Sequence, residues 1–267
     1  MSVVVAIPVY NEEKYVPRVI AHVLEYTERV LVIDDGSTDR TPELLDAIVR
    51  QQGGGGINDC GRGRVRVCRH ERNMGYGRST RDAFEWAGSL GVEWLITMDC
   101  DEQHEPREIP NFVRNAAAGG FDVVSGSRYL CSSEELEREG SPPPDRRRIN
   151  RLMTEEINAR LGLRLTDAFC GFKAYRVAAM QRLALSVDGY AFPMQFWVQA
   201  VAEGLRIKEV PVRLIYNDLN RTFGGPLNDE HVRLAHYRRV LHCELERCAD
   251  RLPAASREGV QAGCAET

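Results

Sequence analysis

The chain of 267 residues has no excess of positive charge and no long apolar run, and we expect no signal peptide. Its net charge of −4 and pI near 5.9 argue against a general nucleic-acid-binding surface, which needs a basic excess. Because no stretch of about 18 apolar residues occurs, we expect no membrane-spanning helix. The first residues carry no basic segment and only a short apolar run, unlike a signal peptide. We therefore expect a cytoplasmic protein whose contact with a membrane, at its inner face, is peripheral.

The eight cysteines lack the short paired spacings of a zinc site or a disulfide framework. They are scattered over the chain at positions 60, 68, 100, 131, 170, 243, 248 and 264. Reduced thiols in a cytoplasmic setting are the simplest interpretation.

A glycine fingerprint is also missing after the first apolar stretch. Residues 3–9 form a β-branched run typical of a buried strand. Pro8-Val9-Tyr10-Asn11 stands where a dinucleotide-binding protein would place its glycines. This excludes a Rossmann dehydrogenase.

The chain does contain an alternation of apolar strands and amphipathic helices. Its composition, 43% hydrophobic and 28% charged, is that of a globular protein with a sizeable core. The runs 30–33 and 95–98 are continuously apolar, as in strands buried on both faces. We expect an α/β fold, a mainly parallel Rossmann-like sheet with helices on both faces. The predicted strands are 3–9, 30–33, 65–67, 95–98, 123–128 and 207–212, with a turn and a strand within 167–176. The predicted helices are 16–26, 41–51, 80–87, 109–118, 149–161, 177–183, 194–203 and 231–251.

The apolar run that ends at Met98 is followed by Asp99-Cys100-Asp101-Glu102-Gln103. If extended geometry continues past Met98, the side chains of Asp99, Asp101 and Gln103 point to the same side. Carboxylate and amide oxygens are ligands for Mg²⁺ or Mn²⁺, and such a cation relieves the repulsion between two carboxylates. A polar turn after a buried strand is the alternative.

Polar groups at other strand ends are expected on the same rim. Asp34-Asp35-Gly36-Ser37 follows the second strand, and Asn73-Met74-Gly75-Tyr76-Gly77-Arg78 precedes a helix. The carboxyl ends of parallel strands lie on one rim of a doubly wound sheet, so these segments converge. Glycines at a helix start let backbone N–H groups approach a phosphate, and Arg78 would add a positive charge. The convergence favours a nucleotide site.

Arginines mark the middle of the chain. Arg128 ends the strand 123–128 and is interpreted either as a phosphate clamp or as a surface salt-bridge former. Residues 129–148 contain acids, three prolines and Arg146-Arg147-Arg148, and they predict a mobile acceptor loop. The triple arginine would either hold an anionic acceptor or form a solvated basic turn. The glycine-rich segment 53–64 is interpreted as a solvated connector.

In their order along the chain, these motifs resemble those of family-two glycosyltransferases of the GT-A fold, closest to the dolichol-phosphate mannose synthase-like branch. The resemblance runs from about residue 3 to about residue 216. The segments that carry it are Pro8-Val9-Tyr10-Asn11-Glu12, Asp34-Asp35-Gly36-Ser37-Thr38-Asp39, Asn73-x-Gly75, Asp99-x-Asp101-x-Gln103, Gly126-Ser127-Arg128, Asp167 with Gly171-Phe172-Lys173, and Glu209-Val210-Pro211.

The resemblance implies a nucleotide-diphosphate sugar donor, GDP- or UDP-linked, bound by Pro8, Tyr10, Glu12, Asp35, Asn73, Gly75, Arg78 and Asp99. It implies Mg²⁺ or Mn²⁺ on Asp99, Asp101 and Gln103, bridging the diphosphate, with Arg128 neutralising the same group. Cleavage of the anomeric bond develops negative charge on the diphosphate, and a cation and an arginine stabilise that charge. The expected catalytic residues are Asp101, Arg128 and Asp167.

The acceptor is open at this point. Relatives that glycosylate hydroxyls usually place acids near the start of the helix 194–203, where this chain has Ala191-Phe192-Pro193-Met194-Gln195. A polyprenyl phosphate needs no general base, so the missing acid favours a phosphate acceptor, held by Arg147, Arg148 and Arg221. For a hydroxyl acceptor, Asp167 would be the base. Two departures from the branch concern the acceptor: Gln195 replaces a frequent glutamate, and a lysine is missing after Arg221.

We expect one GT-A catalytic domain over residues 1–252, with a C-terminal helix at 231–251 and a flexible tail at 253–267. The expected function is inverting, metal-dependent transfer of a hexose from a nucleotide-diphosphate sugar to a polyprenyl (dolichyl-type) phosphate. Transfer to a glycan or small-molecule hydroxyl, and a catalytically silent nucleotide-sugar-binding protein, are the alternatives.

Overall fold

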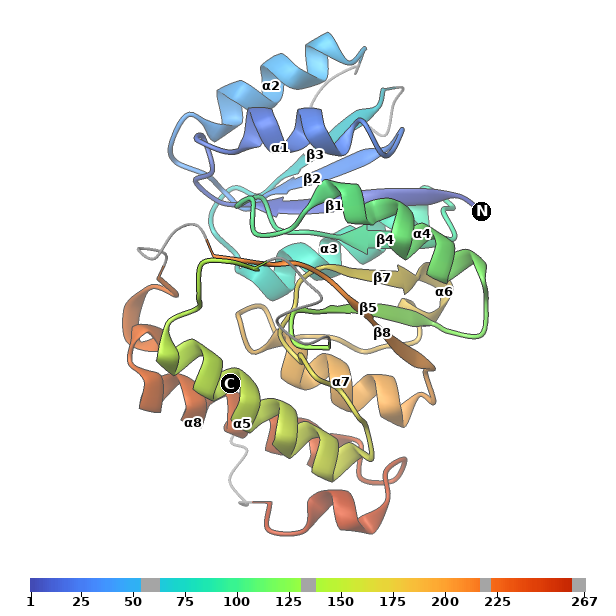
Figure 1. Cartoon of the computed structure of the whole chain (residues 1–267), viewed down its shortest axis with the longest axis vertical. Coiled ribbons are helices and arrows are strands. Elements are labelled where there is room, and N and C mark those ends of the chain that lie inside the picture. Colours follow the sequence, from blue (N-terminus) through green and yellow to red (C-terminus); the bar gives the residue numbers. More distant parts are fainter. Residues whose placement is uncertain (54–62, 131–137, 217–221, 261–267) are drawn as a thin grey trace.

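A computed structural model describes residues 1–53, 63–130, 138–216 and 222–260 (Figure 1). Its centre is a seven-stranded sheet in the order β3-β2-β1-β4-β7-β5-β8. All neighbouring strands run parallel except β7, which is antiparallel to both β4 and β5. The predicted mainly parallel sheet is confirmed. The strands are β1 (Val3–Val9), β2 (Val30–Asp34), β3 (Val65–Arg69), β4 (Trp94–Thr97), β5 (Val123–Ser127), β7 (Lys173–Arg176) and β8 (Ile207–Pro211).

Helices cover both faces of the sheet because the central strands are apolar on both sides. In β1, Val4 and Ala6 belong to one buried cluster, while Val5 and Ile7 belong to the other. Alternate residues of a strand point to opposite faces, so each face has its own core. One face is covered by α1 (Val16–Val23), α2 (Thr41–Gln51) and α4 (Ile109–Ala117), and the other by α3 (Tyr76–Ser89), α6 (Val177–Met180) and α7 (Phe192–Ala202).

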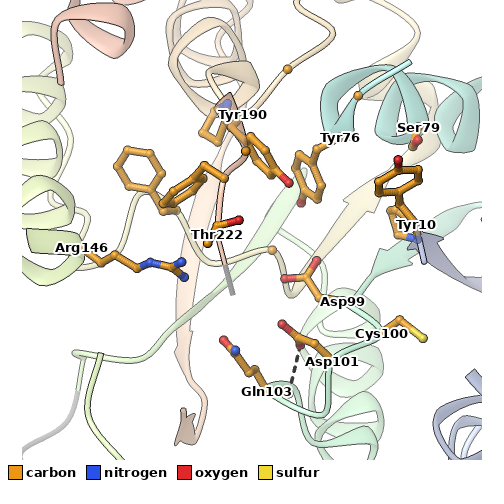
Figure 2. A pocket seen from close by; sticks show the side chains of 18 of the residues that line it. Tyr10, Tyr76, Ser79, Asp99, Cys100, Asp101, Gln103, Arg146, Tyr190 and Thr222 are labelled. Carbon is orange, nitrogen blue, oxygen red and sulfur yellow. Dashed lines mark hydrogen bonds between the residues drawn. The ribbon is translucent and has the colours of Figure 1, made fainter. Parts of the chain in front are cut away.

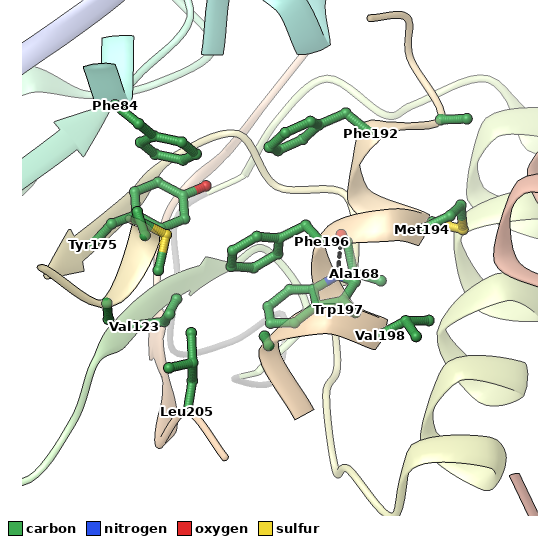
Figure 3. Close-up of a cluster of buried hydrophobic side chains, with 14 of the residues drawn as sticks. Phe84, Val123, Ala168, Tyr175, Phe192, Met194, Phe196, Trp197, Val198 and Leu205 are labelled. Carbon is green, nitrogen blue, oxygen red and sulfur yellow. Dashed lines mark hydrogen bonds between the residues drawn. The ribbon is translucent and has the colours of Figure 1, made fainter. Parts of the chain in front are cut away.

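Two long helices, α5 (Pro144–Leu161) and α8 (Glu230–Arg247), pack next to α7 (Figure 1). The indole of Trp197 in α7 is fully buried, and its Nε1 donates to the Ala168 carbonyl at 2.9 Å. Figure 3 shows the rings of Phe196 and Trp197 beside Tyr175 of β7. α7 thus joins the two long helices to the sheet, because it contacts both of them and packs on β7 through these rings. The remaining short elements are β6 (Arg138–Glu139), β9 (Leu214–Ile215), η1 (Pro106–Glu108), η2 (Gly225–Asn228) and η3 (Ala254–Arg257).

The predicted acceptor loop and C-terminal tail differ in part from the structure. The acceptor loop was expected to extend to residue 148, but α5 already begins at Pro144, because proline in a first helical turn costs no hydrogen bond. Within the same loop, β6 pairs with β9. The tail was expected to be flexible from residue 253, yet Arg160 of α5 donates to the carbonyls of Ser256 and Glu258. Residues 261–267 and most of the predicted glycine-rich connector lie outside the described residues.

The prediction of reduced thiols is wrong for one cysteine. Cys243 in α8 is disulfide-bonded. Cys68, Cys100, Cys170 and Cys248 are free thiols. No helix within the described ranges has both the length and the apolar character needed to cross a bilayer.

Candidate active site

A cavity of about 720 Å³ opens at the rim where β1, β2 and β4 end. Figure 2 shows Tyr10 and Ser79 at one end, Asp99 and Asp101 in the middle, and Arg146 on the opposite side. The lining residues run from Pro8 to Tyr237, so the structure brings together segments that are up to about 230 residues apart in the sequence. The predicted site residues that line the cavity are Pro8, Tyr10, Glu12, Asp35, Asn73, Gly75, Asp99, Asp101, Gln103 and Arg128.

The segment after β1 is shaped by Asn11. Its φ of 56° is in the left-handed region, which asparagine tolerates better than most residues. Its side-chain oxygen accepts from the backbone N–H of Thr38 at 2.8 Å, in the loop after β2. This bond joins the ends of β1 and β2, and it fixes the turn that carries Tyr10 and Glu12 at the cavity wall.

The Asp35 carboxylate organises the glycine segment before α3. Its oxygens accept from the backbone N–H groups of Met74 at 2.7 Å and Gly75 at 2.8 Å. The Nδ1 atom of His70 lies 2.7 Å from the same carboxylate. Asp35 is 4% exposed, so it contributes to the cavity chiefly by holding the start of α3 in place.

Gly75 and Gly77, at the start of α3, each require glycine, but for different structural reasons. Gly75 has a φ of 101°, which disfavours other residues, and it lines the cavity. A Cβ on Gly77 would lie 2.2 Å from the Val187 carbonyl, so Gly77 permits close packing of α3 on that loop. Arg78 was predicted to bind a phosphate, but it does not line the cavity and instead pairs with Asp82 one helical turn later at 2.9 Å. A role of Arg78 toward a phosphate therefore has no support from its position and stays a prediction.

The segment after β4 does not continue as a strand. β4 ends at Thr97, and Glu102 has a φ of 59°, so the expected alternation is wrong. Instead, the chain bends, with the backbone N–H of Gln103 donating to the Asp101 carboxylate at 3.1 Å. The backbone N–H of Asp99 donates to Nδ1 of the buried His104 at 2.9 Å. The bend nevertheless brings Asp99, Asp101 and Gln103 to the same cavity (Figure 2).

The donor set fits Mg²⁺ or Mn²⁺. The two carboxylates of Asp99 and Asp101 and the amide of Gln103 offer only oxygen and amide groups, which these hard cations prefer over thiolates. In the described ranges, no group of three or more His, Cys, Asp or Glu residues is arranged to hold a metal alone. Mg²⁺ is usually bound by one or two carboxylates together with substrate phosphates, so a diphosphate would complete this set.

Arg128 follows β5 and forms a two-point ion pair with Asp167. Nε lies 2.6 Å from Oδ2 and Nη2 lies 3.0 Å from Oδ1, while Asn150 donates to the same carboxylate at 2.8 Å. Burial raises the pKa of Asp167, but the Arg128 charge and the hydrogen bonds outweigh it and lower the pKa to about 2. A fully buried, ionised carboxylate of such low pKa is a poor proton acceptor. This geometry disfavours Asp167 as a base, and Asp167 does not line the cavity, but its reserve role stays a prediction.

The predicted acceptor arginines are not the ones at the cavity. Arg147 is exposed and Arg148 pairs with Glu230 at 3.0 Å, and neither lines the cavity. Arg146 does line it, and Figure 2 shows its guanidinium pointing inward. Because α5 already includes these residues, each position turns by about 100° around the helix, and only one of the three faces inward. Arg221 lies outside the described residues.

Arg146 packs against an aromatic wall. Its guanidinium lies 4.6 Å from the centre of the Phe223 ring, and the guanidinium of Arg233 lies 4.5 Å from the same ring. Phe223 also contacts Tyr190 edge to face at 5.3 Å. Arg233 is buried and pairs with Asp145. Cations stacked on aromatic faces hold both partners in place, so this wall presents positive charge in a fixed geometry.

Gln195 was considered at the acceptor side, but it does not line the cavity. It is 1% exposed, and its Oε1 accepts from the backbone N–H groups of Ser186 and Val187. Its Nε2 donates to the buried carboxylate of Glu244 in α8 at 2.9 Å. Its departure from the branch therefore concerns the packing of α7 on α8. Pro193, two residues earlier, does line the cavity.

Several lining residues were not predicted. Ser79 and Tyr216 contribute hydroxyls that are buried without a hydrogen-bond partner in the described part of the chain. Burial, followed by the charge of Asp99, raises the pKa of Tyr76 well above its ordinary value. Tyrosine side chains also occur often in protein cores, so none of these positions by itself indicated a binding site. The lining residues that were not predicted include Tyr76, Ser79, Tyr190, Tyr216, Phe223 and Arg233, whereas Arg146 belonged to the predicted triple arginine.

Known relatives cover most of this chain. A polyprenol monophosphomannose synthase of Mycolicibacterium smegmatis is 28% identical over 240 residues, covering 87% of this chain and 85% of its own. An undecaprenyl-phosphate mannosyltransferase of Micrococcus luteus is 26% identical over 244 residues, covering 89% of this chain and 94% of its own.

Solved structures agree with the fold. Glucosyl-3-phosphoglycerate synthase from Mycobacterium tuberculosis, in complex with Mn²⁺, uridine diphosphate and glucosyl-3-phosphoglycerate, has a TM-score of 0.63 and 18% identity to this chain. The match covers 94% of this chain and 81% of that one, and it confirms the GT-A fold. The model of the glycosyl transferase family 2 matches residues 4–184. The chain therefore belongs to glycosyl transferase family 2 and is a glycosyltransferase.

Proposed function

We propose that this glycosyltransferase moves a hexose from a nucleotide-diphosphate sugar to a polyprenyl (dolichyl-type) phosphate. In this proposal the reaction inverts the anomeric centre, depends on a divalent cation and takes place at the cytoplasmic membrane face. The names of the two relatives above support a polyprenyl phosphate acceptor. The cavity's own charges support it independently.

The donor would lie along the cavity from Tyr10 toward Asp99. The end with Pro8, Tyr10 and Glu12 offers an aromatic face and polar groups for a base and ribose. The start of α3 follows at Gly75, which also lines the cavity. Asp99 and Asp101 stand next to it, so the diphosphate would sit between the helix and the metal ligands (Figure 2).

Asp99, Asp101 and Gln103 would hold Mg²⁺ or Mn²⁺. When bound, such a cation acts as a Lewis acid that stabilises the negative charge of the leaving diphosphate. The protein's part is to keep the two carboxylates side by side before the donor arrives, which the bend at 99–104 does.

The distribution of charge along the cavity carries the choice of acceptor. Among the described lining residues, the carboxylates are those of Glu12, Asp35, Asp99 and Asp101, and each is assigned to the donor or the metal. The other wall carries the guanidinium of Arg146. A hydroxyl acceptor needs a general base, whereas a phosphate acceptor needs positive charge. The wall around Arg146 offers this positive charge, which favours a phosphate acceptor.

The reaction then requires no proton acceptor. An oxygen of the acceptor phosphate attacks the anomeric carbon from the face opposite the diphosphate. The bond between the anomeric carbon and the diphosphate oxygen breaks, and its electron pair leaves on the nucleoside diphosphate. Arg146 would orient the anionic acceptor, while Arg128 would neutralise charge on the donor diphosphate, and together they offset the repulsion between acceptor and donor.

The test uses purified protein, Mn²⁺, GDP- or UDP-linked radiolabelled sugars and undecaprenyl phosphate in detergent. We expect label to move into the organic phase only when the lipid phosphate is present, and EDTA to abolish transfer. Label that appears only in water-soluble products with a hydroxyl acceptor would contradict the lipid-phosphate acceptor. Transfer that continues in EDTA would contradict the metal.

A further inference from the structure

The main chain at Gly171 lies directly against the Asp99 carboxylate. A Cβ built on Gly171 would lie 2.9 Å from both Oδ1 and Oδ2 of Asp99, and 3.1 Å from the hydroxyl of Tyr76. Real Cβ atoms essentially never come closer than about 3.0 Å to another heavy atom, so this space has no room for a methyl group. Only glycine leaves the carboxylate where it stands.

The backbone conformation of Gly171 does not by itself require a glycine at this position. The positive-φ glycines of the described residues do not include Gly171, so other residues fit its conformation. The chain there is also held on both sides. Thr97 Oγ1 of β4 donates to the Gly171 carbonyl at 2.7 Å, and the backbone N–H of Gly126 in β5 donates to the Phe172 carbonyl at 2.8 Å.

The sheet topology explains why these groups meet. β7 is antiparallel, so the residues that lead into it lie at the rim where its neighbours β4 and β5 end. Gly171 lies at this rim beside Asp99, which follows the last residue of β4, Thr97, by two positions. The contact is therefore a result of placing one reversed strand in an otherwise parallel sheet.

We propose that Gly171 is a positioning residue for Asp99: its missing side chain leaves the space in which the Asp99 carboxylate faces the metal. This inference rests on the metal-dependent function proposed above. With alanine at 171, the backbone cannot yield, and the two groups in the way are the ends of side chains. The carboxylate of Asp99 therefore rotates away, which costs little stability but removes a metal ligand.

The test compares Gly171→Ala with Gly189→Ala. Gly189 lines the same cavity, also lacks a positive φ, and has no atom within 4 Å of a built Cβ. Binding of Mn²⁺ alone is measured by electron paramagnetic resonance, and binding of GDP and of UDP is measured with Mn²⁺ and with EDTA. We expect G171A to weaken Mn²⁺ binding by about tenfold or more, a loss typical when the support of a metal ligand is changed. We expect G189A to stay within about twofold of the wild type in Mn²⁺ affinity, since its methyl group meets nothing.

Two further measurements separate positioning from general damage. Nucleotide affinity in EDTA should not change in G171A, because Asp99 contributes to nucleotide binding only through the metal. In the Asp99→Ala background, G171A should have no further effect on Mn²⁺ binding, since the two act as one unit. Wild-type protein that binds no Mn²⁺ with either nucleotide would overturn the proposed function and this inference with it. Wild-type Mn²⁺ binding combined with an unchanged, or an unfolded, G171A would overturn this inference alone.

Discussion

The guanidinium of Arg128 and the carboxylate of Asp167 form a buried two-point ion pair at 2.6 and 3.0 Å. The pair links the end of β5 to the segment that leads into β7, and it holds Arg128 at the cavity wall. Asp167 is fully buried, and its charge is stabilised by the Arg128 guanidinium, by the side chain of Asn150 and by the backbone N–H groups of Arg128 and Phe169. The pair thus serves both the stability of the fold and the position of a cavity arginine.

We predict that this pair makes the fold acid-sensitive in a narrow range. The pKa of Asp167 falls from 3.8 to about 2 on folding, so the folded state binds fewer protons than the unfolded state. Its contribution is complete above pH 4 and is lost as the pH falls toward 2, by about 2 kcal/mol. Urea unfolding between pH 5 and pH 2 should show this loss in the wild type.

The control for this prediction is Asp167→Asn. It should be less stable at pH 7, by about 3 kcal/mol or more, because it leaves the charge of Arg128 buried without a counter-ion. Its stability should also vary less than that of the wild type over the acid range. If the two proteins lose stability in parallel from pH 4 to pH 2, the low pKa of Asp167 is not the cause.

We predict that Asp101→Ala abolishes transfer and leaves the fold intact. The carboxylate accepts from the backbone N–H of Gln103 at 3.1 Å, and the loss of such a hydrogen bond costs about 1 kcal/mol. The loss of a metal ligand should lower kcat by about 100-fold or more. Activity with a lipid phosphate and the thermal midpoint are measured together. Persistent turnover of the variant would argue against the metal site.

Arg146→Ala and Arg147→Ala form a matched pair of adjacent arginines. Arg146 points into the cavity, while Arg147 is exposed on the outside of α5. We expect R146A to raise the KM for the phosphate acceptor about tenfold, with the KM for the donor unchanged, because one charged hydrogen bond is lost. R147A should be near the wild type in both. Equal effects of the two variants would contradict the assignment of Arg146.

Gln195→Glu tests the departure from the related branch. Gln195 donates to the buried Glu244 at 2.9 Å, so a second carboxylate there removes a donor and adds a like charge. We expect a loss of about 1 to 3 kcal/mol at pH 7. The repulsion raises the folded-state pKa of one carboxyl above its unfolded value, so the variant should regain stability relative to the wild type as the pH falls toward 5.

The double variant Gln195→Glu with Glu244→Gln is the control for this substitution. It restores one donor and one carboxylate, so its stability should approach that of the wild type. Transfer activity at 25 °C should change little in either variant, because Gln195 does not line the cavity. A large loss of kcat in a folded Q195E would show that this position acts on the reaction.

Much of the site was predictable because it follows sheet geometry. Parallel strands end on one rim, so polar residues at positions 10, 35 and 99 had to converge once the strands were recognised. The order of the motifs then predicted the family, which is confirmed. The roles of the individual residues stay predictions.

Details that depend on helix phase or local bends were less accessible. The spacing of Asp99 and Asp101 suggested an extended strand, but a positive φ at Glu102 turns the chain and still brings both carboxylates to the cavity. The three adjacent arginines gave no sign of which one faces inward. That depends on where α5 begins, at Pro144.

The sequence by itself determined the α/β architecture, the rim at which the polar segments meet, and the family. Hydrophobic periodicity and ordered motifs are local properties, so they can be recognised without coordinates. The tertiary structure alone decided that Arg128 is paired with Asp167, that Arg146 faces the cavity, and that Gly171 lies against Asp99. These are contacts between residues far apart in the chain, and they depend on which strands are neighbours and on one strand being reversed.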